Sequence, residues 1–278
     1  MKTGADISHH QASFDAKRYK DSGEHFIILK ATDGRTFTDG TFRDRWADAG
    51  RQGLPRAAYH FAHPGSPVDD QADHFIRVVQ DAGFRAGDAW ALDMEVTEGQ
   101  GPAQLVDWSD KWVARVRAEL GGVGLFYSST GFVTGPMGSP DHVPGGALTW
   151  VARFNKSITS PWQGLQRPAA FPDPPAVWQR TDGTVGRAKQ VASVGFCDFN
   201  EMTDAAFAAL FEGGDMTTDE LLDALESPRG QRILRGAVSE EVATVIRGDD
   251  HTPDGGTHKD NLKNINAAVQ KIKEKLHA

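Results

Sequence analysis

The stretch AWALDMEV, residues 89–96, shows how this chain folds. It begins as an apolar run without polar alternation and ends in two acids, Asp93 and Glu95. Continuous apolar runs are typical of strands that are buried on both faces of a parallel sheet. Seven similar runs occur along the chain, at residues 3–7, 26–31, 56–61, 123–128, 148–154, 176–180 and 194–199. We therefore expect eight strands.

Amphipathic segments that predict helices separate the early strands. They cover residues 14–22, 39–52, 68–82 and 102–120, and the last begins at a proline and ends before two glycines. Strands that alternate with helices indicate right-handed βαβ units. Five prolines between residues 154 and 176 disfavour helices there. We predict an α/β fold, a modified TIM-like barrel whose last three connections lack proper helices and which ends near residue 212.

Composition excludes several classes of protein. The 278 residues carry a net charge of −8, which is a poor match for a protein that holds nucleic acid through phosphate contacts. The single Cys197 cannot form an internal disulfide. No apolar run is long enough to span a membrane, and the first residues lack the apolar core of a signal peptide. We expect a chain that is made and folded in the cytoplasm.

Acidic residues gather at the predicted ends of several strands. In a parallel barrel, catalytic groups lie at the carboxyl ends of the strands, and Asp6, Asp93, Glu95 and Asp198 all occupy such positions. Asp93 and Glu95 are two residues apart, so in a strand they point to the same side, about 6.6 Å apart along the backbone. Two desolvated carboxyls at that spacing cannot both ionise easily, so one pKa should rise. A protonated acid beside an ionised one is what cleavage of a glycosidic bond requires.

A series of short motifs resembles one known family. DISHHQ, IILKATDG, AAYHFAH, ALDMEV, LFYSSTGF, WVARF, VWQ and DFNEM follow one another over about residues 3–212 in the order found in glycoside hydrolase family 25. These are the lysozymes of the Chalaropsis and Streptomyces muramidase type, which are common among phage endolysins. The resemblance implies a (β/α)5(β)3 barrel over residues 1–212.

The same resemblance implies a reaction and roles for the acids. The reaction is cleavage of the β-1,4 bond between N-acetylmuramic acid and N-acetylglucosamine in peptidoglycan, with retention of configuration. Glu95 would be the general acid. Asp93 would orient or activate the acetamido group of the substrate, or act as a nucleophile. Asp6 and Asp198 would line the floor and tune these charges.

Aromatic and polar residues near the strand ends suggest a cleft that binds sugar. Aromatic faces stack on sugar rings, and phenols hydrogen-bond to acetamido groups. We therefore assign substrate binding to Tyr59, Tyr127, Trp178, Lys30 and Gln179. Lys30 could instead form a structural ion pair. Core packing is the expected role of Trp46, Trp108, Trp112 and Trp150.

The sequence predicts neither a metal site nor a cofactor. His9, His10, His60 and His63 lack the spacing of zinc ligands, and the HExxH signature is missing. Glycine-rich phosphate loops are also missing.

Residues 213–278 predict a helical tail. Apolar residues spaced three and four apart form a short heptad seam over residues 259–276. The tail could assemble a homo-oligomer or bind the cell wall. Met216 follows a Glu-Gly-Gly-Asp stretch and could be an internal start of translation.

Three biological settings fit these features. The chain could be a phage endolysin that stays in the host cytoplasm until a holin-type pore releases it to peptidoglycan. It could be a bacterial muramidase that remodels the wall, or an inactive module that binds glycan. The complete set of acids favours an enzyme.

Overall fold

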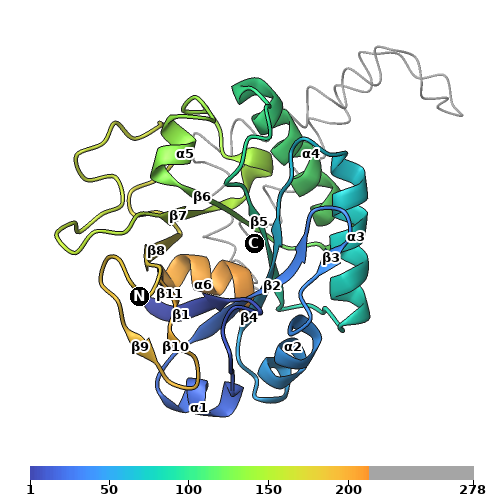
Figure 1. Ribbon diagram of the computed structural model, residues 1–278, viewed down its shortest axis with the longest axis vertical. Coiled ribbons are helices and arrows are strands. Elements are labelled where there is room, and N and C mark those ends of the chain that lie inside the picture. The colour runs from blue at the N-terminus through green and yellow to red at the C-terminus, as the bar shows by residue number, and fades with distance from the viewer. Residues whose placement is uncertain (213–278) are drawn as a thin grey trace, which may run out of the picture. The chain divides into compact units, whose positions relative to one another are not determined.

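In the computed structural model, which describes residues 1–212, eight strands close into a barrel (Figure 1). Around the ring the order is β1, β11, β8, β7, β6, β5, β4 and β2, and β2 pairs with β1 to close it. The bounds are β1 Lys2–Ile7, β2 Phe26–Asp33, β4 Arg56–Phe61, β5 Ala89–Asp93, β6 Leu125–Ser129, β7 Leu148–Ala152, β8 Val177–Thr181 and β11 Asp198–Met202.

Five helices follow the first five strands of the barrel, and the larger ones cover its outside (Figure 1). They are α1 Ala16–Asp21, α2 Phe42–Arg51, α3 Val68–Asp81, α4 Pro102–Leu120 and α5 Thr130–Thr134. Between β7 and β8, and between β8 and β11, the chain has no α-helix. The predicted (β/α)5(β)3 architecture is therefore confirmed.

Besides the eight barrel strands and the five helices, residues 1–212 form several short elements. They are β3 Phe37–Thr38, the single 3-10 turn η1 Pro144–Gly146, the hairpin strands β9 Gln190–Val191 and β10 Gly195–Phe196, and α6 Asp204–Phe211. The hydroxyl of Thr203 caps α6 by accepting a hydrogen bond from the backbone N–H of Ala206.

The predicted eighth strand is wrong in position and direction. Residues 194–199 do not form one strand, because Gly195 and Phe196 belong to the small β9–β10 hairpin and β11 begins at Asp198. β11 runs antiparallel to both β1 and β8, whereas the other neighbours in the ring are parallel. A parallel return needs a long crossover. The short segment after Thr181 contains only a hairpin, so the strand comes back in the opposite direction.

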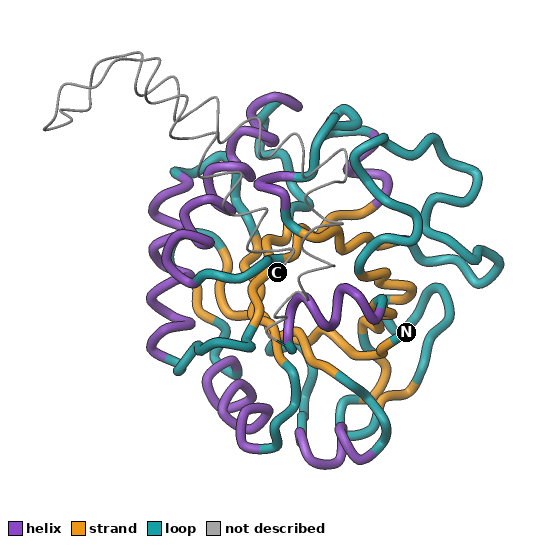
Figure 2. Tube along the Cα trace, turned by 180° about the vertical axis from the view of Figure 1, so that it is seen from behind, coloured by secondary structure: helices purple, strands orange, loops and turns teal. Residues whose placement is uncertain are grey.

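Two apolar layers hold the barrel together. The outer layer lies between the strands and the helices and contains Trp46, Trp108 and Trp112, as expected from the sequence. The inner layer fills the barrel with a mixture of small side chains such as Ala57 and Ala91 and large ones such as Phe26 and Trp150. At the end of the barrel opposite the carboxyl ends of the parallel strands, this layer continues into α6, which lies across the ring in the view from behind (Figure 2).

Within residues 1–212, no helix combines the length and apolar character that crossing a membrane requires. The predictions for the tail, for the seam at residues 259–276 and for Met216 lie outside the described residues.

Candidate active site

Five carboxyl groups line one cavity of about 250 Å³ at the carboxyl ends of β1 and β5, and four of them are the acids predicted from the sequence. Asp6 comes from β1, Asp93 is the last residue of β5, and Glu95 follows two residues later. Asp198 is the first residue of β11 and lies opposite Asp6 in the strand pairing. The sequence placed Asp198 at the end of a parallel strand. It reaches the same end of the barrel because an antiparallel strand begins where its parallel neighbours finish.

Strand alternation explains why these side chains converge. Successive residues of a strand point to opposite faces, so every second residue faces the barrel interior. Ala89 and Ala91 belong to the inner apolar layer, and Asp93 continues their row. Met94 is fully buried in the outer layer, which returns Glu95 to the cavity side. The backbone of Met94 is fixed by hydrogen bonds with β6, since its N–H donates to Tyr127 and its C=O accepts from the Ser128 hydroxyl.

Asp6 is held by two buried amides. The Nε2 of Gln179 lies 3.1 and 3.0 Å from its two oxygens, and the Nδ2 of Asn200 lies 2.7 Å from Oδ2. Each amide also accepts a hydrogen bond from an aromatic residue that lines the cavity. Tyr127 donates its hydroxyl to Gln179 at 2.7 Å, and Trp150 donates Nε1 to Asn200 at 2.7 Å. Burial raises the pKa of Asp6 to about 6, although the two amides favour its ionised form.

The Asp93 and Glu95 carboxyls interact as a pair. Burial raises the pKa of Asp93 well above its ordinary value, and the charge of Glu95 raises it further. Glu95 lies at the exposed mouth of the cavity, yet desolvation by the crowded protein around its carboxyl raises its pKa too. The positive charge of Lys30 opposes both shifts. The pair is therefore suited to hold one proton between two carboxyls.

Asp198 lies beside further negative charge. Burial raises its pKa to about 8, and the charges of Asp6, Asp182 and Glu95 act in the same direction. Asp182 lines the same cavity, but its pKa is lowered, because hydrogen bonds from Val185 and Thr184 outweigh desolvation. Acids of both protonation states therefore lie side by side in this cavity at neutral pH.

Aromatic rings form the remaining wall. Tyr59, Tyr127, Trp150 and Phe154 line the cavity together with Gln179. The rings of Tyr127 and Trp150 lie 4.4 Å apart, and the ring of Tyr59 meets Trp150 edge-on at 6.4 Å. Burial raises the pKa of both tyrosines well above 10, so their hydroxyls stay protonated. The predicted placement of Tyr59, Tyr127 and Gln179 agrees with this geometry.

Two predicted binding residues lie elsewhere. Trp178 precedes Gln179 and therefore points to the opposite face of β8, where its Nε1 donates to the backbone oxygen of Arg153 at 3.1 Å. It lines a separate hollow with Pro161, so the cleft position expected from the sequence is not observed. Lys30 forms an ion pair with Asp33 at 2.6 Å. Its charge acts on Asp93 and Glu95, and it is not among the residues that line the cavity.

Sequence reasoning missed three residues of this site. Asn200 lies in the DFNEM motif two residues after Asp198, and strand alternation, which places both side chains on the inner face, is the signal that could have found it. Trp150 was assigned to the core; it is buried, and it also lines the cavity. Asp182 lies in a loop, where no periodicity predicts the direction of a side chain.

Chemistry, not size, distinguishes this cavity from another. A larger hollow of about 600 Å³ lies between residues 134–139 and 165–169. Among residues 1–212, Arg167 is the one charged residue that lines it, and no carboxyl group does.

Comparison with known proteins agrees with the geometry. Residues 5–186 match the model described as glycosyl hydrolases family 25. The chain belongs to this family. The family resemblance read from the sequence motifs is therefore confirmed.

Several relatives carry names that describe cell-wall enzymes. An autolytic lysozyme from Clostridium acetobutylicum is 35% identical over 102 residues, which cover 37% of this chain and 31% of that protein. An N,O-diacetylmuramidase from Chalaropsis is 32% identical over 141 residues, covering 45% and 65%. The solved bacterial lysozyme of Streptomyces coelicolor superposes with a TM-score of 0.65 at 25% identity, covering 77% of this chain and 98% of that one. The chain thus spans 31% to 65% of the length of the curated relatives it matches.

Proposed function

We propose that this family 25 chain is a muramidase that cleaves the β-1,4 bond between N-acetylmuramic acid and N-acetylglucosamine in peptidoglycan. The observation that carries the proposal is the pair of Asp93 and Glu95, two neighbouring carboxyls with raised pKa values in a cavity lined by aromatic rings. The names of the lysozyme and muramidase relatives support the choice of substrate.

Glu95 is the general acid in this proposal. It lies at the exposed mouth, where the glycosidic oxygen of a bound strand can reach it, and its raised pKa keeps a proton available. Proton donation to that oxygen accompanies cleavage of its bond to the anomeric carbon. The proton shared with Asp93 moves to Glu95 when substrate binds, so that Asp93 is left ionised beside the developing positive charge.

Asp93 then stabilises the anomeric centre, either through the acetamido group of the substrate or by direct attack. Both routes retain configuration, and Glu95 afterwards takes a proton from the attacking water. Tyr59 supplies a protonated hydroxyl to polar groups of the sugar, and the hydroxyl oxygen of Tyr127, whose proton is donated to Gln179, can accept a hydrogen bond from them. Asp6 and Asp198 line the cavity and set its charge.

The test is Glu95→Gln, assayed on purified peptidoglycan. We expect a loss of roughly 10²- to 10⁴-fold in kcat, because the amide cannot donate the proton. Glu119→Gln is the matched control, since Glu119 is an exposed acid of α4 that pairs with Arg115. Reducing-end analysis of the wild-type product should show N-acetylmuramic acid. Full activity of Glu95→Gln would refute the general acid, and absence of any wild-type cleavage would favour a glycan-binding module.

We extend the proposal to the biological setting of a phage endolysin that is held in the host cytoplasm until a holin-type pore opens. The resemblance to a family common among endolysins supports this setting. Production inside a bacterium should leave cells intact until the inner membrane is permeabilised, and lysis should then be rapid. Recovery of active enzyme from the medium of intact cells would favour a wall-remodelling muramidase instead.

A last part of the proposal concerns residues 259–276, whose heptad seam would join copies of the chain. The supporting observation is the spacing of Leu262, Ile265, Val269, Ile272 and Leu276. Light scattering of the full chain should give a multiple of 30.2 kDa. Ile265→Asp should reduce the mass to that of one chain. A monomeric wild type would contradict assembly and leave wall binding as the role of the tail.

A further inference from the structure

His63 lies in the loop between β4 and α3, and each of its ring nitrogens faces a carboxylate. Nε2 is 2.7 Å from Oδ1 of Asp33, and Nδ1 is 2.5 Å from Oε1 of Glu98. A neutral imidazole has one N–H and can donate to only one of these groups. Both contacts are hydrogen bonds at the same time when the ring is an imidazolium with two N–H groups.

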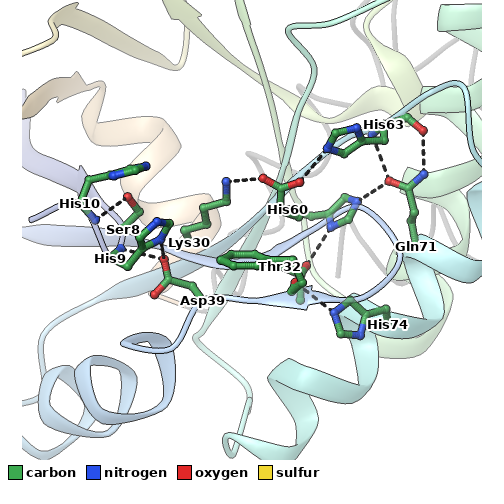
Figure 3. A network of polar contacts seen from close by, with 12 residues as sticks. Ser8, His9, His10, Lys30, Thr32, Asp39, His60, His63, Gln71 and His74 are labelled. Carbon is green, nitrogen blue, oxygen red and sulfur yellow. Dashed lines mark hydrogen bonds and ion pairs between the residues drawn. The ribbon is translucent and has the colours of Figure 1, made fainter. Parts of the chain in front are cut away.

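The backbone of His63 is fixed from the α3 side. Its N–H donates to Oε1 of Gln71 at 3.0 Å, and its C=O accepts from Nε2 of Gln71 at 2.8 Å. Gln71 is fully buried and also lies 3.1 Å from Nε2 of His60 (Figure 3). Gly34 packs against the ring, since a Cβ there would come within 3.1 Å of it. The position of the imidazole is therefore fixed by the hydrogen bonds of its backbone and by the packing of its ring.

Glu98 lies on the loop that follows β5, three residues after Glu95. Its carboxylate binds His63 through Oε1 and accepts the backbone N–H of Gly65 at 2.9 Å through Oε2. Its own backbone has φ of 45°, a conformation that non-glycine residues adopt only with strain. These two hydrogen bonds tie the loop of Glu95 to the loop between β4 and α3.

The contacts of His63 also lead toward the catalytic pair. Asp33, at the end of β2, binds His63 with one oxygen and Lys30 with the other, at 2.6 Å. The positive charge of Lys30 in turn favours ionisation of Asp93 and Glu95. Lys30 and His63 therefore lie on opposite sides of the carboxylate that they share, that of Asp33 (Figure 3).

We infer that His63 is a positioning residue for catalysis: as an imidazolium it clamps the loop that carries Glu95 to the end of β2, and this clamp weakens when the ring loses a proton and with it one of its two hydrogen bonds to carboxylates. The inference rests on the proposed function, because it concerns the placement of the proposed general acid. Glu98 is the partner that transmits the clamp to Glu95.

The charges around His63 favour the protonated ring. Desolvation lowers its pKa, but the hydrogen bonds and charges of Glu98 and Asp33 outweigh it, so the pKa is raised above 6.5. The buried His60 is neutral, because burial lowers its pKa to about 3. Lys30 is paired with Asp33, Arg35 with Asp70 at 2.8 Å, and His74 has a lowered pKa through burial. A raised pKa means that the clamp is complete at low pH and is lost as pH rises through that value.

The test compares His63→Gln with His142→Gln across pH 5 to 9 on purified peptidoglycan. His142 also bridges two carboxylates, Asp110 at 2.8 Å and Asp141 at 3.1 Å, but it lies outside the cavity. We expect kcat/KM of His63→Gln to be roughly tenfold below wild type at pH 5, mainly through kcat, because a small displacement of a catalytic group has an effect of this size. The ratio should approach one at high pH, whereas His142→Gln should match wild type throughout.

A second measurement does not depend on catalysis. The ring protons of His63, assigned by their loss in His63→Gln, should titrate above 6.5 in wild type and at lower pH in Glu98→Gln. The ratio of kcat/KM with His63 to kcat/KM with His63→Gln should also fall toward one at a lower pH when both enzymes carry Glu98→Gln. A ratio that does not change with pH, or a His63 that titrates at or below 6.5, would overturn the clamp. If wild type does not cleave peptidoglycan, the proposed function fails while the titration still reports on the clamp.

Discussion

Asp6 shows how single residues set the chemistry of this cavity. It is buried, which favours the neutral acid, yet Asn200 and Gln179 donate hydrogen bonds that favour the carboxylate. Asn200→Ala would leave the indole N–H of Trp150 without its partner and remove one donor from Asp6. We expect a loss of about 1 to 3 kcal/mol in the free energy of unfolding at pH 7. Urea unfolding followed by tryptophan fluorescence measures it.

The matched control for Asn200→Ala is Asn155→Ala, since Asn155 is a loop residue whose side chain accepts one backbone hydrogen bond, from Ser157. This control should change stability by less than the buried variant. The pKa of Asp6 should also rise further in Asn200→Ala, because a hydrogen bond that lowers it is gone. Equal stability of the two variants would contradict the structural role assigned to Asn200.

At the scale of elements, the sequence predicts those features that depend on neighbouring residues, such as the bounds of a helix. The bounds of α4 agree with the sequence, because a first-turn proline and a glycine of φ 69° at its end mark both limits. The direction of β11 could not be predicted, since it depends on which neighbours the strand pairs with after a short hairpin. The prediction that Trp178 lies in the cleft is wrong for a related reason. That a residue is aromatic and near a strand end does not indicate which face of the strand its side chain occupies.

Helix α6 provides a prediction that separates stability from catalysis. Phe207 is 7% exposed and packs with Phe211 and with the inner layer, at the end of the barrel away from the carboxyl cavity. Phe207→Ala should lower the free energy of unfolding by about 3 kcal/mol, because it opens a void in this layer. Its kcat per folded molecule should equal that of wild type. A fall in kcat at full folding would show that α6 also acts on the site.

For the molecule as a whole, raised and lowered pKa values predict how stability depends on pH. Asp6 and Asp198 have raised values of about 6 and 8, so the stability linked to them is lost as pH rises from about 4 toward these values. His63 and His142 act in the same direction above 6.5. Lowered acids such as Asp182 act oppositely, and so does the buried His60, since the stability linked to these lowered pKa values is lost as pH falls. The two raised acids act over the wider part of the range from pH 5 to 8. The barrel should therefore be more stable at pH 5 than at pH 8.

Asp198→Asn tests the main contributor to this dependence. Relative to wild type, the variant should gain stability as pH rises from about 4 to 8, by more than roughly 1 kcal/mol, because it removes a carboxyl that resists ionisation. Asp182→Asn should show the opposite sign and lose stability above pH 4, since its carboxylate accepts backbone hydrogen bonds from Thr184 and Val185. All seven tryptophans lie within residues 46–178, so fluorescence of the full chain reports on the barrel alone. A wild type equally stable at pH 5 and 8 would mean that the cavity holds its carboxyls without the mutual repulsion inferred from their burial.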